Sequence, residues 1–428
     1  MTCKFSRFLI FFLVCIGCSP GMLMVERPIV PGSLTVVQLS EDGSIVGNLD
    51  QLPLPGAIAG PSDIVVRDGR VYIASYKQFL IVEGDESGQL QLISSLPLPG
   101  YDTALALHST EAVAYATNSQ GLFVIDIGDS AEPKLAAHLQ LSEELAKLNL
   151  PTPLKAPVGT DIGCEDNKLV LTLQGKGVNP TTPRAGIPSR AGIAMVFDVE
   201  KALSPRIERA LDPLSGAAAV AMGLYHHQVF VAGDELVEYK DFKREPTNGT
   251  GLWFKSVTFD NGVRSPGDIP GDVIEMKFVM GSRNDWESGK TADIVKQYRR
   301  ASAEERRELE ALTPLDQGII FIATEHAVVS TPLSLKILRW RLKNRTVSDS
   351  YPRLYGIDAH GHSVYVAAGE SGVDVLKSDG FIEFSRRGRL KSLPAPALDV
   401  ASSGGKLYVL CGELNVKNVQ HNERLIKQ

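Results

Sequence analysis

The sequence predicts an all-β fold built from one repeated four-stranded unit, and three observations support this prediction. Short runs of alternating apolar residues, joined by polar turns, recur along most of the 428 residues, as they do in half-buried antiparallel strands. Tyr72 and Tyr115 occupy matching places in two such units, 43 residues apart. The chain also exceeds the roughly 250–300 residues at which one simple core stops growing, which favours a repetitive architecture.

The unit is clearest between residues 62 and 139. A first hairpin covers 62–75 and a second covers 79–96, and the same pair recurs at 103–118 and 121–139. A four-stranded unit that repeats every 40 to 45 residues or so is typical of a β-propeller blade.

Seven first hairpins can be counted along the chain. The other five lie at 160–174, 219–233, 273–281 with 318–326, 355–369, and 397–412. Second hairpins follow six of the seven, including those at 191–211, 334–350 and 372–390. The last first hairpin lacks one, but an unpaired second hairpin stands at 32–52. We therefore expect a seven-bladed β-propeller closed by N- and C-terminal strands that share one blade. A pair of β-sandwiches is the alternative.

Two stretches of the chain carry a family resemblance. They read GLFVIDIGDSAEP at 121–133, preceded by AYAT, and more distantly IAMVFDVEKALSP at 193–205. These stretches resemble the LVIVD-repeat propellers, a bacterial extracytoplasmic group. The resemblance extends from about Gly32 to Gly412. It implies the propeller fold and a place in the bacterial envelope, but no agreed reaction.

The N-terminus predicts export. A positively charged start is followed by an apolar run of nine residues at 8–16 and then by Cys18. This run is too short to span a bilayer and predicts a secretory signal peptide at 1–17. The segment resembles the bacterial lipoprotein signal, which implies lipidation of Cys18, palmitate included, and an anchored linker at 18–31. Because Ser19 and not Asp follows the cysteine, the resemblance implies the outer membrane. An ordinary secretory signal cut nearby is the alternative.

The predicted propeller spans 32–413 and leaves a C-terminal tail at 414–428. A long insertion at 282–316 divides the first hairpin of blade five. Its second half has a helical pattern, because Ser302 and Glu305 form a capping box. We expect a helical insertion there, with a solvated charged face. A helix that docks a partner is the alternative.

The predicted strand order assigns the remaining insertions to two faces of the disc. Connections after the second and fourth strands of a blade leave from one face, and those after the first and third leave from the other. The insertions at 141–157, 175–190 and 261–271 therefore share one face, whereas 240–251, placed after a third strand, lies opposite. The shared face is our candidate binding face because it carries three arginines: Arg184, Arg190 and Arg264.

One set of carboxylates recurs with the repeat. Asp63, Asp161 and Asp399 each stand nine residues before the matching position of the next strand. Three blades thus place a carboxylate at the start of the innermost strand, where converging oxygens could hold a hard cation such as calcium. The alternative is that each aspartate accepts hydrogen bonds from backbone N–H groups at a junction between blades.

Composition and motifs exclude several classes of function but do not identify one. The net charge of −6 gives no electrostatic reason to bind nucleic acid or an anionic membrane surface. Motifs for haem attachment, a nucleophile elbow or a zinc-binding helix are absent from the sequence. We expect no cofactor beyond the calcium considered above. The expected function is a membrane-anchored binding or scaffold module for an envelope protein or glycan. An envelope hydrolase or lyase with its site on the same face is the alternative.

Overall fold

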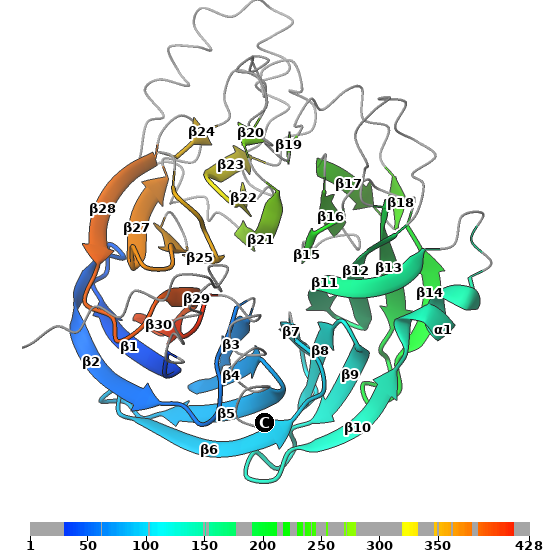
Figure 1. Ribbon diagram of the computed structural model, residues 1–428, viewed down its shortest axis with the longest axis horizontal. Coiled ribbons are helices and arrows are strands. Elements are labelled where there is room, and N and C mark those ends of the chain that lie inside the picture. The colour runs from blue at the N-terminus through cyan, green and yellow to red at the C-terminus, as the bar shows by residue number, and fades with distance from the viewer. Residues whose placement is uncertain are drawn as a thin grey trace, which may run out of the picture.

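The computed structural model is a ring of antiparallel sheets around a central axis (Figure 1). It describes residues 30–60, 62–101, 103–148, 150, 154–176, 191–211, 217–222, 229–233, 236–240, 242–244, 254–255, 269–270, 272–279, 319–332, 346–348, 351–360, 363–378 and 384–414. Seven sheets have four strands each, which confirms the all-β, seven-bladed propeller.

Blades 1 to 3 follow each other along the chain. Blade 1 comprises β3 (Asp63–Arg67), β4 (Arg70–Ser75), β5 (Gln78–Gly84) and β6 (Leu90–Pro97). Blade 2 comprises β7 (Ala104–Leu107), β8 (Val113–Asn118), β9 (Gly121–Asp126) and β10 (Lys134–Leu139). The helix α1 (Leu141–Ala146) leads into blade 3, which comprises β11 (Lys155–Glu165), β12 (Lys168–Lys176), β13 (Ala191–Asp198) and β14 (Arg206–Ala210).

Blades 4 to 6 complete the part of the ring that is continuous in sequence. Blade 4 comprises β15 (Ala219–Met222), β16 (Val229–Ala232), β17 (Leu236–Lys240) and β18 (Lys243–Arg244). A parallel pair, β19 (Phe254–Lys255) and β20 (Ile269–Pro270), precedes blade 5. Blade 5 comprises β21 (Val273–Val279), β22 (Ile319–Thr324), β23 (Val328–Pro332) and β24 (Thr346–Val347). Blade 6 comprises β25 (Gly356–His360), β26 (Ser363–Ala367), β27 (Val373–Ser378) and β28 (Phe384–Leu390).

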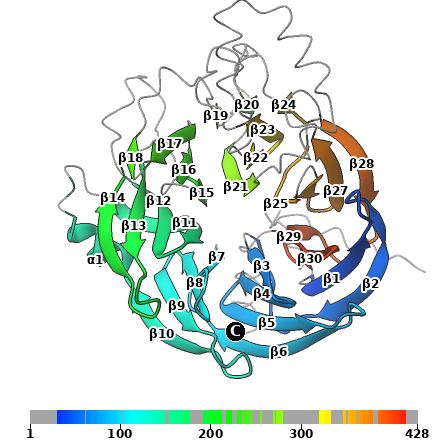
Figure 2. The ribbon, with the colours of Figure 1, turned by 180° about the vertical axis from the view of Figure 1, so that it is seen from behind.

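Blade 7 joins the two ends of the described chain, as the sequence predicted. Its strands are β29 (Ala397–Ser403), β30 (Lys406–Cys411), β1 (Ser33–Leu39) and β2 (Ile45–Pro53), in the order β2-β1-β30-β29. β1 pairs with β30 in antiparallel register from Ser33↔Cys411 to Gln38↔Lys406. The innermost strands of neighbouring blades pack against each other all the way round, so the ring is closed (Figures 1 and 2).

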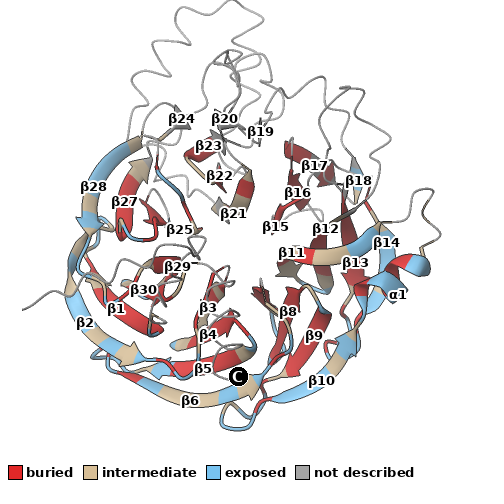
Figure 3. Cartoon of the chain, viewed as in Figure 1, coloured by how far each residue is buried: buried red, intermediate tan, exposed pale blue. Residues whose placement is uncertain are grey.

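Burial is greatest in the middle strands of each blade, and innermost strands such as β3 and β11 are only partly buried. Second and third strands such as β8 and β9 are almost continuously buried, because both faces of each middle strand lie against neighbouring blades. Outer strands such as β2 alternate between intermediate and exposed residues. Figure 3 shows this change from red middle strands to tan and pale blue outer strands. The strong apolar runs that marked the repeat in the sequence are therefore mostly the middle strands.

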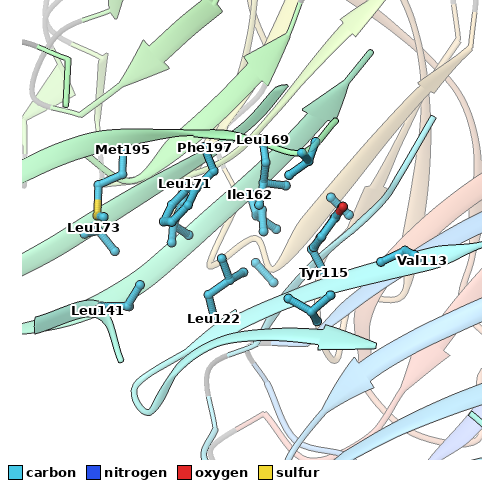
Figure 4. Close-up of a cluster of buried hydrophobic side chains, with 14 of the residues drawn as sticks. Val113, Tyr115, Leu122, Leu141, Ile162, Leu169, Leu171, Leu173, Met195 and Phe197 are labelled. Carbon is cyan, nitrogen blue, oxygen red and sulfur yellow. The ribbon is translucent and has the colours of Figure 1, made fainter. Parts of the chain in front are cut away.

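The hydrophobic core is divided among the seven contacts between blades. One cluster of buried apolar side chains lies at each of these contacts. Figure 4 shows the cluster between blades 2 and 3, where Tyr115 and Leu122 face Ile162 and Leu171. Leu141 of α1 packs onto the same cluster. Stability thus comes from neighbouring pairs of blades and not from one central core.

Two predicted connections differ from the structure. In blade 4, the fourth strand β18 pairs with β17 through Tyr239↔Arg244 and Lys240↔Lys243. The insertion predicted at 240–251 therefore continues from a fourth strand and not from a third. The prediction that it leaves from the opposite face was wrong.

In blade 5 the third strand is β23, ahead of the hairpin predicted at 334–350. The Thr324 hydroxyl accepts a hydrogen bond from the Ala327 N–H at 3.1 Å and so closes a tight turn from β22 into β23. The stretch from 334 alternates more regularly between apolar and charged residues than β23 does, which misled the sequence prediction.

Several predicted features lie outside the described residues. They are the signal peptide at 1–17, Cys18 and most of its linker, the helical insertion at 282–316, and Arg184, Arg190 and Arg264. Within the described ranges, no helix has both the length and the apolar character needed to cross a membrane.

The closing blade can be tested with two leucines of its own sheet. Leu34 of β1 is fully buried and pairs with Leu410, whereas Leu49 of β2 is 38% exposed. We expect Leu34→Ala to lower the free energy of unfolding by about 2–5 kcal/mol, because it leaves a cavity between blades 7 and 1. Leu49→Ala is expected to cost less than about 1 kcal/mol. Urea denaturation followed by circular dichroism measures both, and equal losses would contradict the closing role of β1.

Candidate functional site

The three predicted aspartates lie on innermost strands around the axis. Asp63 begins β3, Asp161 lies within β11, and Asp399 lies within β29. All three have the same register in their hairpins. The residue two positions after each aspartate pairs with Tyr72, Val170 or Tyr408, respectively. The sequence repeat therefore located this position correctly in all three blades.

Each of these carboxylates accepts a hydrogen bond from the backbone of the next blade. The acceptor oxygens lie 3.0 Å from the Ile64 nitrogen for Asp399, 2.7 Å from the Leu105 nitrogen for Asp63, and 2.8 Å from the Val220 nitrogen for Asp161. A buried backbone N–H without a partner is costly. The aspartates therefore act as ties between innermost strands, as the alternative interpretation of the sequence proposed.

A fourth carboxylate makes the same contact and was missed from the sequence. Glu275 of β21 accepts a hydrogen bond from the Ile357 nitrogen of β25 at 2.7 Å. Its strand is separated from β22 by a long insertion, so the repeat was harder to align there. An acidic residue followed by an apolar one, as in Asp63-Ile64 and Glu275-Met276, was the available signal.

Blades 2, 4 and 6 have small residues at the position that the carboxylates occupy in the other four blades. They are Ala104, Ala219 and Gly356, which immediately precede the N–H groups that the carboxylates bind. A Cβ atom on Gly356 would lie 2.0 Å from Asp399 Oδ1, which is far inside van der Waals contact. A side chain at Gly356 would therefore displace the Asp399 carboxylate from its position.

The second carboxylate oxygen of each aspartate has different hydrogen-bond partners in different blades. Oδ1 of Asp161 and Oδ1 of Asp399 accept hydrogen bonds from the N–H of the following residue, both at 2.8 Å. The Ile64 N–H that would serve Asp63 in this way is bound by Asp399. Asp63 Oδ1 is consequently buried without a hydrogen-bond partner among the described residues.

A lysine supplies positive charge beside this ring of carboxylates. Lys277 Nζ lies 2.6 Å from Glu275 Oε1, and the lysine side chain is 30% exposed. Burial alone lowers the pKa of Lys277, but attraction to Glu275, Asp63 and further carboxylates raises it well above its ordinary value. Lys277 is therefore a firmly charged counter-ion on the axis.

Burial raises the pKa of each carboxyl in the ring. It does so for Asp63, for Asp161 and, together with repulsion from neighbouring carboxylates, for Asp399. The pKa of Glu275 rises to about 6, since burial outweighs the opposing attraction of Lys277. Charged carboxylates are costly when desolvated, so the ring favours protonated groups to a higher pH than free side chains would.

The calcium prediction stays a prediction. Calcium binds six to eight oxygens, whereas one oxygen of each aspartate already accepts a hydrogen bond from the neighbouring blade. In the described ranges, no three histidine, cysteine, aspartate or glutamate side chains are grouped so that they could hold a metal ion.

The candidate binding face can be followed through the ends of the described strands. The helix α1 lies between β10 and β11 at one face of the disc. β12 ends and β13 begins at this face, and so do β18 and β21, respectively. Because β30 is the second strand and β1 the third strand of blade 7, the end at Cys411 and the start at Ser33 lie there as well. This face is called the loop face below, and the opposite one the turn face.

Comparison with known proteins supports the fold and not a function. A protein from Lactobacillus plantarum has a solved structure that is similar, with a TM-score of 0.50 and 10% sequence identity over 89% of this chain and 99% of that one. A Bacteroides fragilis protein described as "a putative 6-phosphogluconolactonase" matches with a TM-score of 0.43 and 10% identity over 86% of this chain and 95% of that one. No family model matches the sequence, and no curated protein matches it.

Glu275 gives the carboxylate ring a measurable pH dependence. Its pKa is about 6 in the folded chain against an ordinary 4.5, so between these values the folded chain holds a proton that the unfolded chain has released. The free energy of unfolding therefore falls as the pH rises through this window, by about 2 kcal/mol for this group. We expect Glu275→Gln to flatten the decline between pH 4.5 and 6.5, measured by urea denaturation.

The matched control is Glu83→Gln, which alters an exposed carboxylate on β5. It is expected to keep the pH profile of the unchanged protein. A Glu275→Gln protein with the same decline as the unchanged chain would show that Glu275 does not titrate in this range.

Proposed function

We propose that the protein is an outer-membrane-anchored extracytoplasmic propeller that binds an acidic protein or glycan on its loop face. The observation that carries the proposal is the strand order of blade 7. It brings the described chain in at Ser33 and out at Cys411 on the same face as the connections from β12 to β13 and from β18 to β21. The proposed anchor and the proposed contact surface therefore belong to one side of the disc.

The axial ring supports a binding role over catalysis. An enzyme site needs acid, base or metal groups that are free to reach a substrate. Here the four axial carboxylates each accept a hydrogen bond from the backbone of a neighbouring blade. The groups with the most perturbed pKa values on the axis thus hold the blades together, and their shifts follow from that burial.

The proposed anchor limits how far this face can lie from the membrane. A lipid on Cys18 would leave the linker at 18–31 before the first propeller strand. A fully extended chain of that length spans at most about 50 Å. The loop face would therefore stay within reach of partners embedded in, or lying close to, the same membrane.

The partner chemistry follows from the three arginines assigned to the loop face. Arg184, Arg190 and Arg264 fall between β12 and β13 or between β18 and β21. Guanidinium groups bind carboxylates and phosphates through paired hydrogen bonds. An acidic protein surface or an acidic glycan is the class of partner that such a face would recognise.

The anchor is tested by Cys18→Ser in the bacterium of origin. We expect the unchanged protein to sediment with outer-membrane fractions and to incorporate radiolabelled palmitate. Cys18→Ser is expected to lose the label and to move to the soluble envelope fraction, since a serine cannot carry the thioether-linked lipid. Cys164→Ser, which alters a thiol within β11, is the control and should behave as the unchanged chain does. Equal labelling of the Cys18→Ser protein would rule out this anchor.

The contact surface is tested by replacing its three arginines together. Arg184→Gln, Arg190→Gln and Arg264→Gln in one chain are expected to reduce at least about tenfold the yield of a partner captured by cross-linking in the intact envelope, because several charge-assisted hydrogen bonds are lost. The control combines Arg206→Gln and Arg387→Gln, which alter exposed arginines on the outer strands β14 and β28. Equal capture by the triple variant and the control would overturn the proposed surface.

A further inference from the structure

A second candidate site lies on the turn face, between blades 1 and 2. A cavity of about 300 Å³ opens there, and Arg67, Arg70, Tyr72, Ser109, Thr110 and Ile127 are among the residues that line it. This volume is at the lower end of the range for small-ligand pockets. The cavity is separate from the axial ring and from the arginines assigned to the loop face.

Tyr72 lines this cavity, and its hydroxyl has no hydrogen-bond partner among the described residues. The residue is 4% exposed, and its ring stacks on Phe79 with the ring centroids 6.3 Å apart. The hydroxyl is not among the buried polar atoms that lack a partner, so it is open to the cavity. A ligand in the cavity would supply the acceptor that the protein does not.

Two of the three matching tyrosines in other blades show what this hydroxyl lacks, whereas Tyr408, at the same place in β30, also has no hydrogen-bond partner among the described residues. Tyr115, at the same place in β8, donates a hydrogen bond to the Ala202 carbonyl of the next blade at 2.8 Å. Tyr365, at the same place in β26, donates to the Gly43 carbonyl of its next blade at 3.3 Å. Each of these carbonyls belongs to the connection between a third and a fourth strand. At Tyr72 the cavity lies where the corresponding contact would be.

Positive charge gathers on one side of the cavity. Arg67 and Arg70 are direct cross-strand partners in the hairpin of β3 and β4, and like charges in this relation repel each other. The Arg67 guanidinium donates hydrogen bonds to the carbonyls of His108 and Glu111 and forms no ion pair with a described carboxylate. Carbonyls are neutral, so they leave its charge uncompensated.

Two carboxylates nearby limit this charge without cancelling it. Glu83 accepts a hydrogen bond from Arg70 Nε at 3.2 Å, but both side chains are more than 40% exposed. An ion pair of this kind is weak in water. Asp68 lies in the turn between the two arginines and also lines the cavity, so its charge opposes an incoming anion.

We propose that this cavity binds the carboxylate or phosphate group of a small polar ligand. The oxyanion would lie between Arg67 and Arg70 and accept a hydrogen bond from the Tyr72 hydroxyl. The hydroxyl groups of Ser109 and Thr110 would face the remaining polar part of the ligand, and Ile127 would provide an apolar wall. This site does not depend on the proposed loop-face partner or on the lipid anchor.

The test is isothermal titration calorimetry on the full chain with glucuronate, inorganic phosphate and uncharged glucose. We expect one or both oxyanions to bind with an affinity that weakens as salt is added, and glucose to bind at least about tenfold more weakly because it lacks the charge. Binding of glucuronate alone assigns a carboxylate ligand, and binding of phosphate alone assigns a phosphate. No binding of either oxyanion would overturn the proposal.

Tyr72→Phe and Tyr115→Phe form a matched pair of variants. Tyr72→Phe removes only the hydroxyl and is expected to weaken oxyanion binding about fivefold, with little change in melting temperature. Tyr115→Phe removes a hydrogen bond between blades and is expected to lower the melting temperature while leaving binding unchanged. Equal binding by Tyr72→Phe and the unchanged protein would remove the hydroxyl from the site.

Two further variants test the charge. Arg70→Gln is expected to weaken oxyanion binding about tenfold, and Asp68→Asn to strengthen it, since the first removes an attractive charge and the second a repulsive one. Both residues are in or beside the exposed turn, so folding is expected to survive both changes. Arg70→Gln and Asp68→Asn proteins with the same affinity would contradict an electrostatic site.

Discussion

The pairing of β1 with β30 is the contact on which the rest of this fold depends. In the part of the chain that the structure describes, each blade packs chiefly against its two neighbours, so a ring that fails at one contact exposes two faces of apolar side chains. β1 comes from the N-terminal part of the chain and β30 from its end, and their register from Ser33↔Cys411 to Gln38↔Lys406 joins the two. Without this pairing, both strands would present unpaired edges. The Asp399 carboxylate adds a tie across the same junction by binding the Ile64 N–H of β3.

The alternation of carboxylates and small residues around the axis has a steric cause. In the order of the ring, Ala104 comes before Asp161, Ala219 before Glu275, and Gly356 before Asp399. The space that a Cβ on Gly356 would need is taken by Asp399, which shows why a carboxylate favours a small neighbour. Asp63 is the exception, because it follows Asp399 directly across the closing junction. Its Oδ1 is the one carboxylate oxygen of the ring that the described structure leaves buried and without a partner.

The sequence predicts the blades well because each hairpin is a local pattern. Counting first and second hairpins was enough to place the shared blade. The aspartates were located because each stands nine residues before the position that matches Tyr72. What the aspartates bind could not be predicted, since the Ile64 N–H lies 335 residues from Asp399. Glu275 was missed because a long insertion separates its strand from β22. The short strands β18 and β23 were missed because two to five residues carry too little alternation to compete with longer patterns nearby.

The same physical requirement explains both the axial ring and the turn-face cavity. Polar groups at a contact between blades need partners, and most of these contacts supply them: backbone N–H groups meet carboxylates on the axis, and Tyr115 meets the Ala202 carbonyl near the turn face. The contact between blades 1 and 2 meets the requirement on the axis, where Asp63 binds the Leu105 N–H. Near the turn face it places Tyr72 with its unpaired hydroxyl, Arg67 and Arg70 around one cavity. A small oxyanion complements all three groups at once, whereas water would satisfy the hydrogen bonds and leave the charge of Arg67 uncompensated.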